Sequence, residues 1–136
     1  MKDDCLFCKL ANGVFPTNMV YEDDDFSVIM DISPAAKGHC LVVAKEHYEN
    51  VLVASDEVLS KGLVVAAKVA RGVKKAMGCD GINILQNNGA AAGQTVYHLH
   101  IHVIPRWEND SIDLAPKPQQ AEDDLAAVAK LISENM

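Results

Sequence analysis

One short segment constrains the fold more than any other, because histidine alternates with apolar residues at His98, His100 and His102. Successive side chains of a β-strand point to opposite faces of its sheet. We therefore predict a strand over residues 96–104 in which the three imidazoles share one face and the intervening apolar side chains face the core. Neighbouring imidazoles would lie about 6–7 Å apart, twice the rise per residue, and could line one pocket.

Three chemical interpretations of this histidine face deserve weight. An exposed polar strand face explains it poorly, because histidine is rare and the rest of the strand is apolar. Two strand histidines at positions i and i+2 can bind zinc together with ligands from elsewhere. Alternatively, imidazoles that line a pocket can act as nucleophile or proton donor. The residues of the strand alone leave a metal site and catalysis equally open.

The segment before this strand is typical of a loop that approaches an anion. Asn87 and Asn88 precede the small residues 89–93, and Gln94 and Thr95 then lead into the histidine strand. Small residues let backbone amides come close to a phosphate, while amide and hydroxyl side chains supply neutral donors. Such loops are often simple hairpins, but beside three imidazoles this one predicts a phosphate cradle.

The remaining segments indicate an α+β domain with a largely antiparallel five-stranded sheet. Patterning and turn residues predict strands at residues 20–22, 26–31, 39–45, 81–87 and 96–104. Short helices are expected at residues 6–12 and 122–134. We expect a single domain over residues 1–136, with a core at 5–106 and an extension at 107–136 that is extended or loose up to about residue 120.

The clearest helix lies between the third and fourth predicted strands. Ser55 can cap its N-terminus, acidic residues suit its first turn, and Gly78 is placed to end it. Apolar residues that recur every three or four positions predict one buried face. They are Leu59, Leu63, Ala66, Ala70, Val73 and Met77.

Composition limits the partners of the chain. Twelve basic and 19 acidic residues give a formal net charge of −7, which argues against binding nucleic acid or an anionic membrane through a basic face. No apolar run reaches the roughly 18–20 residues of a membrane span. The acidic start of the chain is unlike a signal peptide, so we expect a cytoplasmic protein.

The four cysteines are too few and too scattered for a disulfide framework. Cys5 and Cys8 have the two-residue spacing of many structural zinc sites, although a single such pair can also be idle or redox-active. Cys40 and Cys79 are expected to be small core residues. The sequence therefore contains a candidate metal half-site near its N-terminus.

Residues 93–104, read Gly-Gln-Thr-Val-Tyr-His-Leu-His-Ile-His-Val-Ile, resemble the signature of the histidine triad nucleotide-binding family. The similarity continues upstream at residues 21–24, 31–34 and 38–43 and covers roughly residues 5–106. The chain is most similar to the small Hint-like bacterial members. This resemblance implies a homodimer with one nucleotide site per subunit.

The resemblance also implies roles for individual residues. His100 matches the nucleophile that becomes transiently nucleotidylated, and His39 and His102 match histidines that contact the phosphate. Asp31 matches the acidic residue that binds the ribose hydroxyls. In the loop, Asn87 and Gln94 match side chains that contact the phosphate. Thr95 matches a position usually held by serine, whose hydroxyl can assist the leaving group.

A structural zinc site follows from the same resemblance. The catalytic interpretation engages three of the five histidines and leaves His47 and His98. Many bacterial members of the family bind zinc through a Cys-x-x-Cys pair and two such histidines. The implied ligands are Cys5, Cys8, His47 and His98, and no organic cofactor is expected.

The function implied is a nucleotide-binding hydrolase that cleaves purine nucleoside phosphoramidates or nucleotidyl adducts through a nucleotidyl-histidine. Imidazole has an ordinary pKa near 6.5, so most of it is a competent nucleophile at pH 7. One alternative is a dinucleoside polyphosphate hydrolase, which needs the same nucleophile. Others are a non-catalytic nucleotide-binding regulatory module and a metalloenzyme with zinc on the triad.

Overall fold

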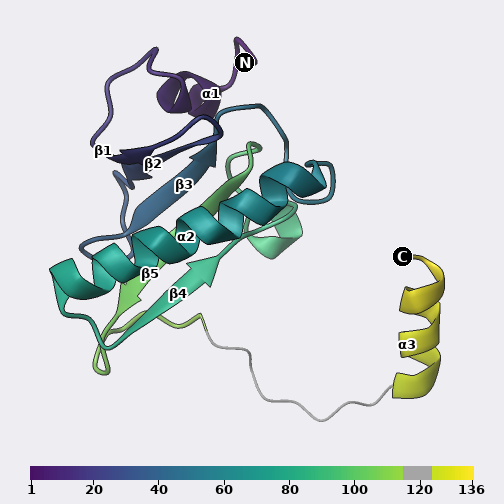
Figure 1. Ribbon diagram of the computed structural model, residues 1–136. Helices are drawn as coiled ribbons and strands as arrows, with labels where there is room; N and C mark the ends of the chain where they lie inside the picture. Colours follow the sequence, from purple (N-terminus) through teal and green to yellow (C-terminus); the bar gives the residue numbers. More distant parts are fainter. Residues whose placement is uncertain (115–123) are drawn as a thin grey trace.

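The computed structural model describes residues 1–114 and 124–136, and its centre is a five-stranded antiparallel sheet (Figure 1). The predicted α+β class and the five strands are confirmed. In chain order the elements are α1 (Leu6–Ala11), β1 (Met19–Glu22), β2 (Phe26–Met30), β3 (Cys40–Ala44), α2 (Asp56–Met77), β4 (Gly81–Leu85), the 3-10 helix η1 (Ala90–Ala92), β5 (His100–Arg106) and α3 (Leu125–Glu134).

The histidine strand β5 lies inside the sheet, whose strand order is β1-β2-β3-β5-β4. On one side His100 pairs with Val43 of β3, and His102 pairs with Leu41. On the other side His102 pairs with Leu85 of β4. Because hydrogen bonds hold its backbone on both sides, β5 is a firm platform for the side chains that it carries.

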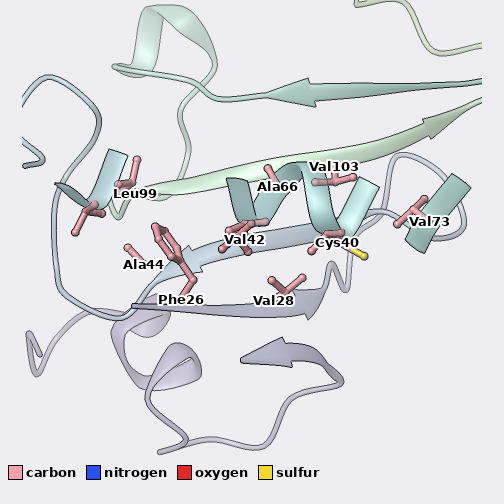
Figure 2. Packing of buried hydrophobic residues seen from close by; sticks show 12 residues of the cluster. Phe26, Val28, Cys40, Val42, Ala44, Ala66, Val73, Leu99 and Val103 are labelled. Atoms are coloured by element: carbon pink, nitrogen blue, oxygen red, sulfur yellow. The ribbon is translucent and has the colours of Figure 1, made fainter. Parts of the chain in front are cut away.

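The long helix α2 crosses one face of the sheet and covers the main core. Figure 2 shows this cluster, in which Val42 and Val103 of the sheet lie against Ala66 and Val73 of the helix. Leu99 belongs to the same cluster, and Ile101 packs against it. The alternate apolar residues around the histidines thus face the core, as predicted.

The opposite face of the sheet carries α1 and the histidines. Phe7 and Ala11 of α1 pack on Ile29, Leu41 and Val43, which point away from α2. This second cluster is small, so the sheet face around it stays open for polar side chains. The helix α1 therefore stands beside the histidines and forms one wall of any site there.

The predicted limits of the histidine strand, residues 96–104, were wrong at both ends. The backbone around Leu99 leaves the regular ladder, because its N–H donates to the Tyr48 carbonyl at 2.7 Å while its carbonyl accepts from Ala44. The strand therefore begins at His100 and continues through Pro105, which pairs with Ile82. Proline is tolerated there because β3 has already ended and no donor is needed on that side.

The predicted ends of α2 are confirmed. The Ser55 side chain accepts from the Val58 N–H, and Gly78 ends the helix in the left-handed region at φ 61°. The predicted buried face was wrong at Leu63, which is 61% exposed. The sheet instead meets a stripe rotated by about one residue, through Gly62 and Val65. Because α2 is apolar over more than one stripe, its sequence did not decide which stripe faces the sheet.

The C-terminal helix α3 begins at Leu125, with Asp124 as its N-cap, and buries none of its side chains. The first residues of the helix predicted at residues 122–134, and residues 115–120 of the loose extension predicted before it, lie outside the described residues. Within the described ranges, no helix is both long and apolar enough to cross a lipid bilayer.

The contact between α2 and the sheet gives a stability prediction. A Cβ added at Gly62 would lie 3.3 Å from Phe26 Cζ and 3.4 Å from Ile101 Cδ1. We expect Gly62→Val to lower the free energy of unfolding by about 1–3 kcal/mol through overpacking. Gly72→Val, at a helix position with nothing within 4 Å of the added Cβ, is the matched control and should change it by under about 0.5 kcal/mol. Urea titrations measure both, and equal losses would contradict the packing argument.

Candidate functional site

The histidine face borders a cleft of about 570 Å³ between α1, β2 and β5, which we call the histidine cleft. Its polar lining residues are Asn18, Asp31, Ser33, Thr17, Thr95, His100 and His102. Much of its apolar wall comes from Leu6, Phe7, Leu10, Ile29, Ile32 and Leu41. A volume of this size suits a small-molecule ligand with an apolar part and a few polar anchors.

The backbone fixes the tautomer of His100. Its Nδ1 lies 2.6 Å from the His98 carbonyl oxygen, which can only accept, so Nδ1 carries the proton. The other ring nitrogen, Nε2, is then bare in the neutral imidazole. Burial lowers the pKa of His100, and the His98 carbonyl and the Asp31 charge oppose that shift only in part. His100 is therefore a neutral ring with an unprotonated Nε2.

A second backbone contact orders His39 and His102. The Ala35 N–H donates to His39 Nδ1 at 3.0 Å, so the proton of neutral His39 is on Nε2. That Nε2 lies 2.9 Å from His102 Nδ1, which accepts, and His102 then carries its own proton on Nε2. Burial, with the neighbouring His100 and His39, lowers the pKa of His102 to about 4. His102 is thus a neutral donor at neutral pH.

Asp31 follows β2 and brings a carboxylate to the same cleft. Its Oδ1 accepts from the Ser33 N–H at 2.8 Å, and its Oδ2 lies 3.5 Å from His39 Nε2. The first contact orders the turn after β2, and the second keeps the carboxylate beside the histidines. The cleft therefore contains one acceptor group suited to hydroxyls next to a set of neutral imidazoles.

In the loop before β5, two of the side chains predicted to contact a phosphate form hydrogen bonds to nearby backbone groups. Gln94 is 4% exposed and uses its amide internally, since Oε1 accepts from Gly89 N–H and Nε2 donates to the Glu49 carbonyl, each at 2.7 Å. Asn87 Nδ2 is 3.5 Å from the Gly93 carbonyl, across the same loop. Neither residue is among the cleft's lining, whereas Thr95 is.

The structure thus gathers five of the predicted catalytic and nucleotide residues around one cleft and leaves two in a supporting loop. The five are Asp31, His39, Thr95, His100 and His102. The apolar wall from α1 was not predicted as part of the site. Its signal in the sequence was weak, because Leu6, Phe7 and Leu10 on a six-residue helix look like ordinary core residues.

The predicted zinc ligands form a second cluster, the Cys/His cluster, which consists of Cys5, Cys8, His47 and His98. His98 Nδ1 lies 3.3 Å from Cys5 Sγ, 3.4 Å from Cys8 Sγ and 3.2 Å from His47 Nδ1. All four ligand atoms lie within 4.8 Å of one another. Zn–N bonds of about 2.0–2.1 Å and Zn–S bonds of about 2.3 Å place tetrahedral ligands about 3.3–3.8 Å apart. The cluster has almost this spacing.

The surroundings of the Cys/His cluster also suit a cation. His98 Nε2 donates to the Ala44 carbonyl at 2.6 Å, which leaves Nδ1 bare toward the sulfurs. The Lys2 N–H donates to Cys8 Sγ and the Cys8 N–H donates to Cys5 Sγ, each at 3.4 Å. Amide donors stabilise thiolates, and thiolates with bare imidazole nitrogens are the ligands that zinc prefers. The donor set therefore fits a tetrahedral zinc ion.

A metal among Asp31, His39 and His102 is less suitable, although their ligand atoms also lie close together. The Ala35 N–H occupies His39 Nδ1, so the proton of the neutral ring blocks Nε2. To bind a metal, Nε2 would have to lose its proton, and Nδ1 cannot take up that proton while it accepts the hydrogen bond from Ala35. The hydrogen bonding disfavours the interpretation that places zinc on the triad.

With this fold, a histidine cleft beside β5 and a Cys/His cluster next to it, the chain is an α+β protein of the histidine triad class. It belongs to the HIT family, whose domain model matches residues 12–109. Among solved structures, a HIT family protein from Bacillus anthracis is 36% identical, with a TM-score of 0.90 over 100% of this chain and 99% of that one.

Two further relatives have informative descriptions. An adenosine 5'-monophosphoramidase of Saccharomyces cerevisiae is 35% identical over 96% of this chain and 79% of its own length. A zinc-bound histidine triad family protein from Mycobacterium smegmatis is 36% identical, with a TM-score of 0.77 over 96% of this chain and 97% of that one. The family therefore includes hydrolases of nucleoside phosphoramidates and at least one member that binds zinc.

The low pKa of His102 gives a prediction on pH-dependent stability. The folded protein keeps His102 neutral down to about pH 4, whereas the unfolded chain takes up that proton near pH 6.5. The contribution of His102 is therefore complete above pH 6.5 and lost as the pH falls toward 4. Between these values wild type should lose about 2–3 kcal/mol more unfolding free energy than His102→Asn. Denaturant titrations across this range test it, and parallel pH profiles would contradict it.

Proposed function

We propose that this protein is a hydrolase that cleaves purine nucleoside phosphoramidates or related nucleotidyl adducts through a covalent nucleotidyl-His100 intermediate. The observation that carries the proposal is the 2.6 Å contact between His100 Nδ1 and the His98 carbonyl. It leaves Nε2 unprotonated on a ring that lines the histidine cleft. The relative that is an adenosine 5'-monophosphoramidase supports both the reaction and the purine.

In the first step, the Nε2 lone pair attacks the α-phosphorus, and the bond from phosphorus to the leaving amine breaks. The ring becomes cationic, and the His98 carbonyl stabilises it through Nδ1–H. His102 Nε2–H donates to a non-bridging oxygen, and the Thr95 hydroxyl relays a proton from solvent water to the leaving amine nitrogen. Water then attacks phosphorus, the Nε2–P bond breaks and a proton is released, which yields a nucleoside monophosphate and neutral His100.

Binding of the nucleoside follows from the two walls of the cleft. Asp31 accepts hydrogen bonds from the ribose hydroxyls, and the apolar side chains of α1 and β2 enclose the base. Asn87 and Gln94 serve the phosphate indirectly in this proposal, because they order the loop whose amides face it. His39 acts on the phosphate through His102, with which it shares a hydrogen bond.

The charge of the cleft favours a phosphoramidate over a dinucleoside polyphosphate. All of the lining residues lie in the described part of the chain, and none of them is a lysine or arginine. Asp31 adds a negative charge, and the low pKa of His102 keeps that ring neutral. A phosphoramidate carries about one negative charge at phosphorus, whereas a polyphosphate leaving group carries several that this site does not compensate.

The enzymatic proposal predicts different effects of His100→Asn on turnover and on binding. We expect kcat for an adenosine 5'-phosphoramidate to fall about a thousandfold or more, because the nucleophile is lost. The affinity for AMP should stay within about threefold, since the cleft keeps its walls and Asp31. Wild type quenched rapidly in acid should yield a nucleotidylated peptide that contains His100 in mass spectrometry.

Diadenosine polyphosphates are the control substrates for this experiment. Wild type should turn them over with a kcat/KM at least about tenfold lower than that of the phosphoramidate. The reverse preference would support the polyphosphate hydrolase instead. AMP binding without turnover of either substrate would support a regulatory nucleotide-binding module and refute the hydrolase.

We also propose that the Cys/His cluster holds a structural zinc ion. The ion would join the N-terminal segment and α1 to the segments around His47 and His98, which lie far apart in the sequence. Support comes from the bare His98 Nδ1, the amide donors to both sulfurs and the zinc-bound relative. A metal that crosslinks such segments contributes directly to the free energy of folding.

The zinc proposal predicts the metal content of two cysteine variants. Wild type should contain about one zinc per chain, and Cys5→Ala/Cys8→Ala should contain almost none. Cys40→Ala/Cys79→Ala, which removes two buried cysteines that are not among the clustered ligands, is the matched control and should keep its zinc. Mass spectrometry of metals after gel filtration measures both. Zinc retained by the first variant would place the ion elsewhere.

The predicted homodimer stays a proposal, and two surfaces support it. β4 is an edge strand of the sheet, with Ile84 42% exposed. On α2, Leu63 and Val64 are 61% and 67% exposed, although they lie within a helix that is otherwise packed on the sheet. A two-fold contact through this region would cover both apolar groups and leave one histidine cleft per subunit.

A further inference from the structure

His98 belongs to two sites at once. Its ring joins the Cys/His cluster through Nδ1, 3.3 Å from Cys5 Sγ and 3.4 Å from Cys8 Sγ. Its backbone carbonyl accepts from His100 Nδ1 at 2.6 Å. The residue is fully buried, and its second ring nitrogen is fixed by the Ala44 carbonyl. The groups that hold the His98 ring therefore also restrain the backbone whose carbonyl orients His100.

Phe7 provides a second link between the two sites. It lies between the cluster residues Cys5 and Cys8 in the sequence, and its ring points at the histidines. The Phe7 and His100 rings meet edge to face, with centroids 5.0 Å apart and an interplanar angle of 78°. The Phe7 and His98 centroids are 6.1 Å apart. The position of the Cys-x-x-Cys turn thus also fixes one face of the His100 ring.

The His98 carbonyl has no substitute as a partner for His100. Within the described residues, it is the sole hydrogen-bond partner that the structure shows for the His100 ring. A neutral imidazole without such a partner exchanges between two tautomers, and only the one with bare Nε2 is oriented for attack in the cleft. Nucleophiles work when surrounding groups hold them to within about 0.5 Å of the productive geometry.

We propose that the Cys/His cluster with its bound metal positions the nucleophile: it holds His98 and Phe7 so that they lock the orientation and tautomer of His100. The inference rests on the proposed function, because it assigns the cluster a part in that reaction beyond joining segments of the fold. His47 and the two cysteines are then positioning residues, since they act on His100 only through His98 and Phe7.

The variant His47→Gln tests this role, because His47 is a cluster residue that lines none of the histidine cleft. We expect kcat for an adenosine 5'-phosphoramidate to fall about 10–100-fold, as is usual when a supporting partner is lost, while the affinity for AMP stays within about threefold. The adjacent Glu46→Gln, at an exposed side chain, is the matched control and should leave both unchanged.

Histidine NMR reads the tautomer directly and needs no turnover. In ¹⁵N-labelled wild type, long-range proton–nitrogen spectra should show His100 as a single form protonated at Nδ1. In His47→Gln the His100 nitrogens should shift toward values averaged over two tautomers. An unchanged His100 pattern together with an unchanged kcat, in a variant that only melts at a lower temperature, would overturn the proposal and leave the cluster a purely structural element.

Cobalt substitution gives a second measurement that does not depend on the variant folding. Wild type loaded with Co²⁺ should show the visible bands of a tetrahedral sulfur and nitrogen site. AMP bound beside His100 contacts the ring that the His98 carbonyl orients, and the resulting small movement of His98 should shift these bands. Bands that are unaffected by saturating AMP would overturn the proposal even if His47→Gln does not fold.

The two proposals fail in different ways. If wild type turns over neither substrate, the hydrolase is refuted, yet the tautomer and cobalt measurements still decide whether the cluster orients His100. If wild type is active and forms nucleotidyl-His100 but the cluster variant keeps full kcat, the hydrolase stands and the positioning role is refuted.

Discussion

The central place of β5 in the sheet is the constraint on which the rest of the site depends. Hydrogen bonds to β3 and β4 fix its backbone from both sides, and the core under α2 holds Leu99 and Val103. His100 and His102 then have one face available, the face beside α1. Since the strand starts only at His100, His98 is released from the ladder and turns its ring to the Cys/His cluster instead.

Backbone groups decide which nitrogen of each imidazole in the histidine cleft carries the proton. The His98 carbonyl assigns the proton of His100, and the Ala35 amide assigns that of His39 and through it that of His102. Burial lowers the pKa of each of these three rings, so they stay neutral near pH 7. The chain has a net charge of −7, but its partly desolvated cleft contains neutral hydrogen-bond donors. Such donors suit a phosphate group of low charge.

Much of the fold could be predicted because local signals were strong. Ser55 and Gly78 marked α2, and alternation with flanking turn residues marked the strands. Where two local solutions were equally good, prediction failed. Leu63 lies on one of two apolar stripes of α2, and only contact with the sheet selects the other stripe. The start of β5 depends on a bond from Leu99 to Tyr48, a residue far away in the sequence.

By itself, the sequence determined that His100 and His102 share a sheet face and that a Cys-x-x-Cys pair lies near the N-terminus, because strand alternation and residue spacing are local properties. Only the tertiary structure decided which ring nitrogen of His39, His98 and His100 carries the proton. Whether a ring nitrogen is bare depends on the carbonyl or amide opposite it, and those groups come from distant segments: Ala44 for His98 and Ala35 for His39. The same holds for Gln94, whose amide is used inside its loop because the Glu49 carbonyl lies beside it.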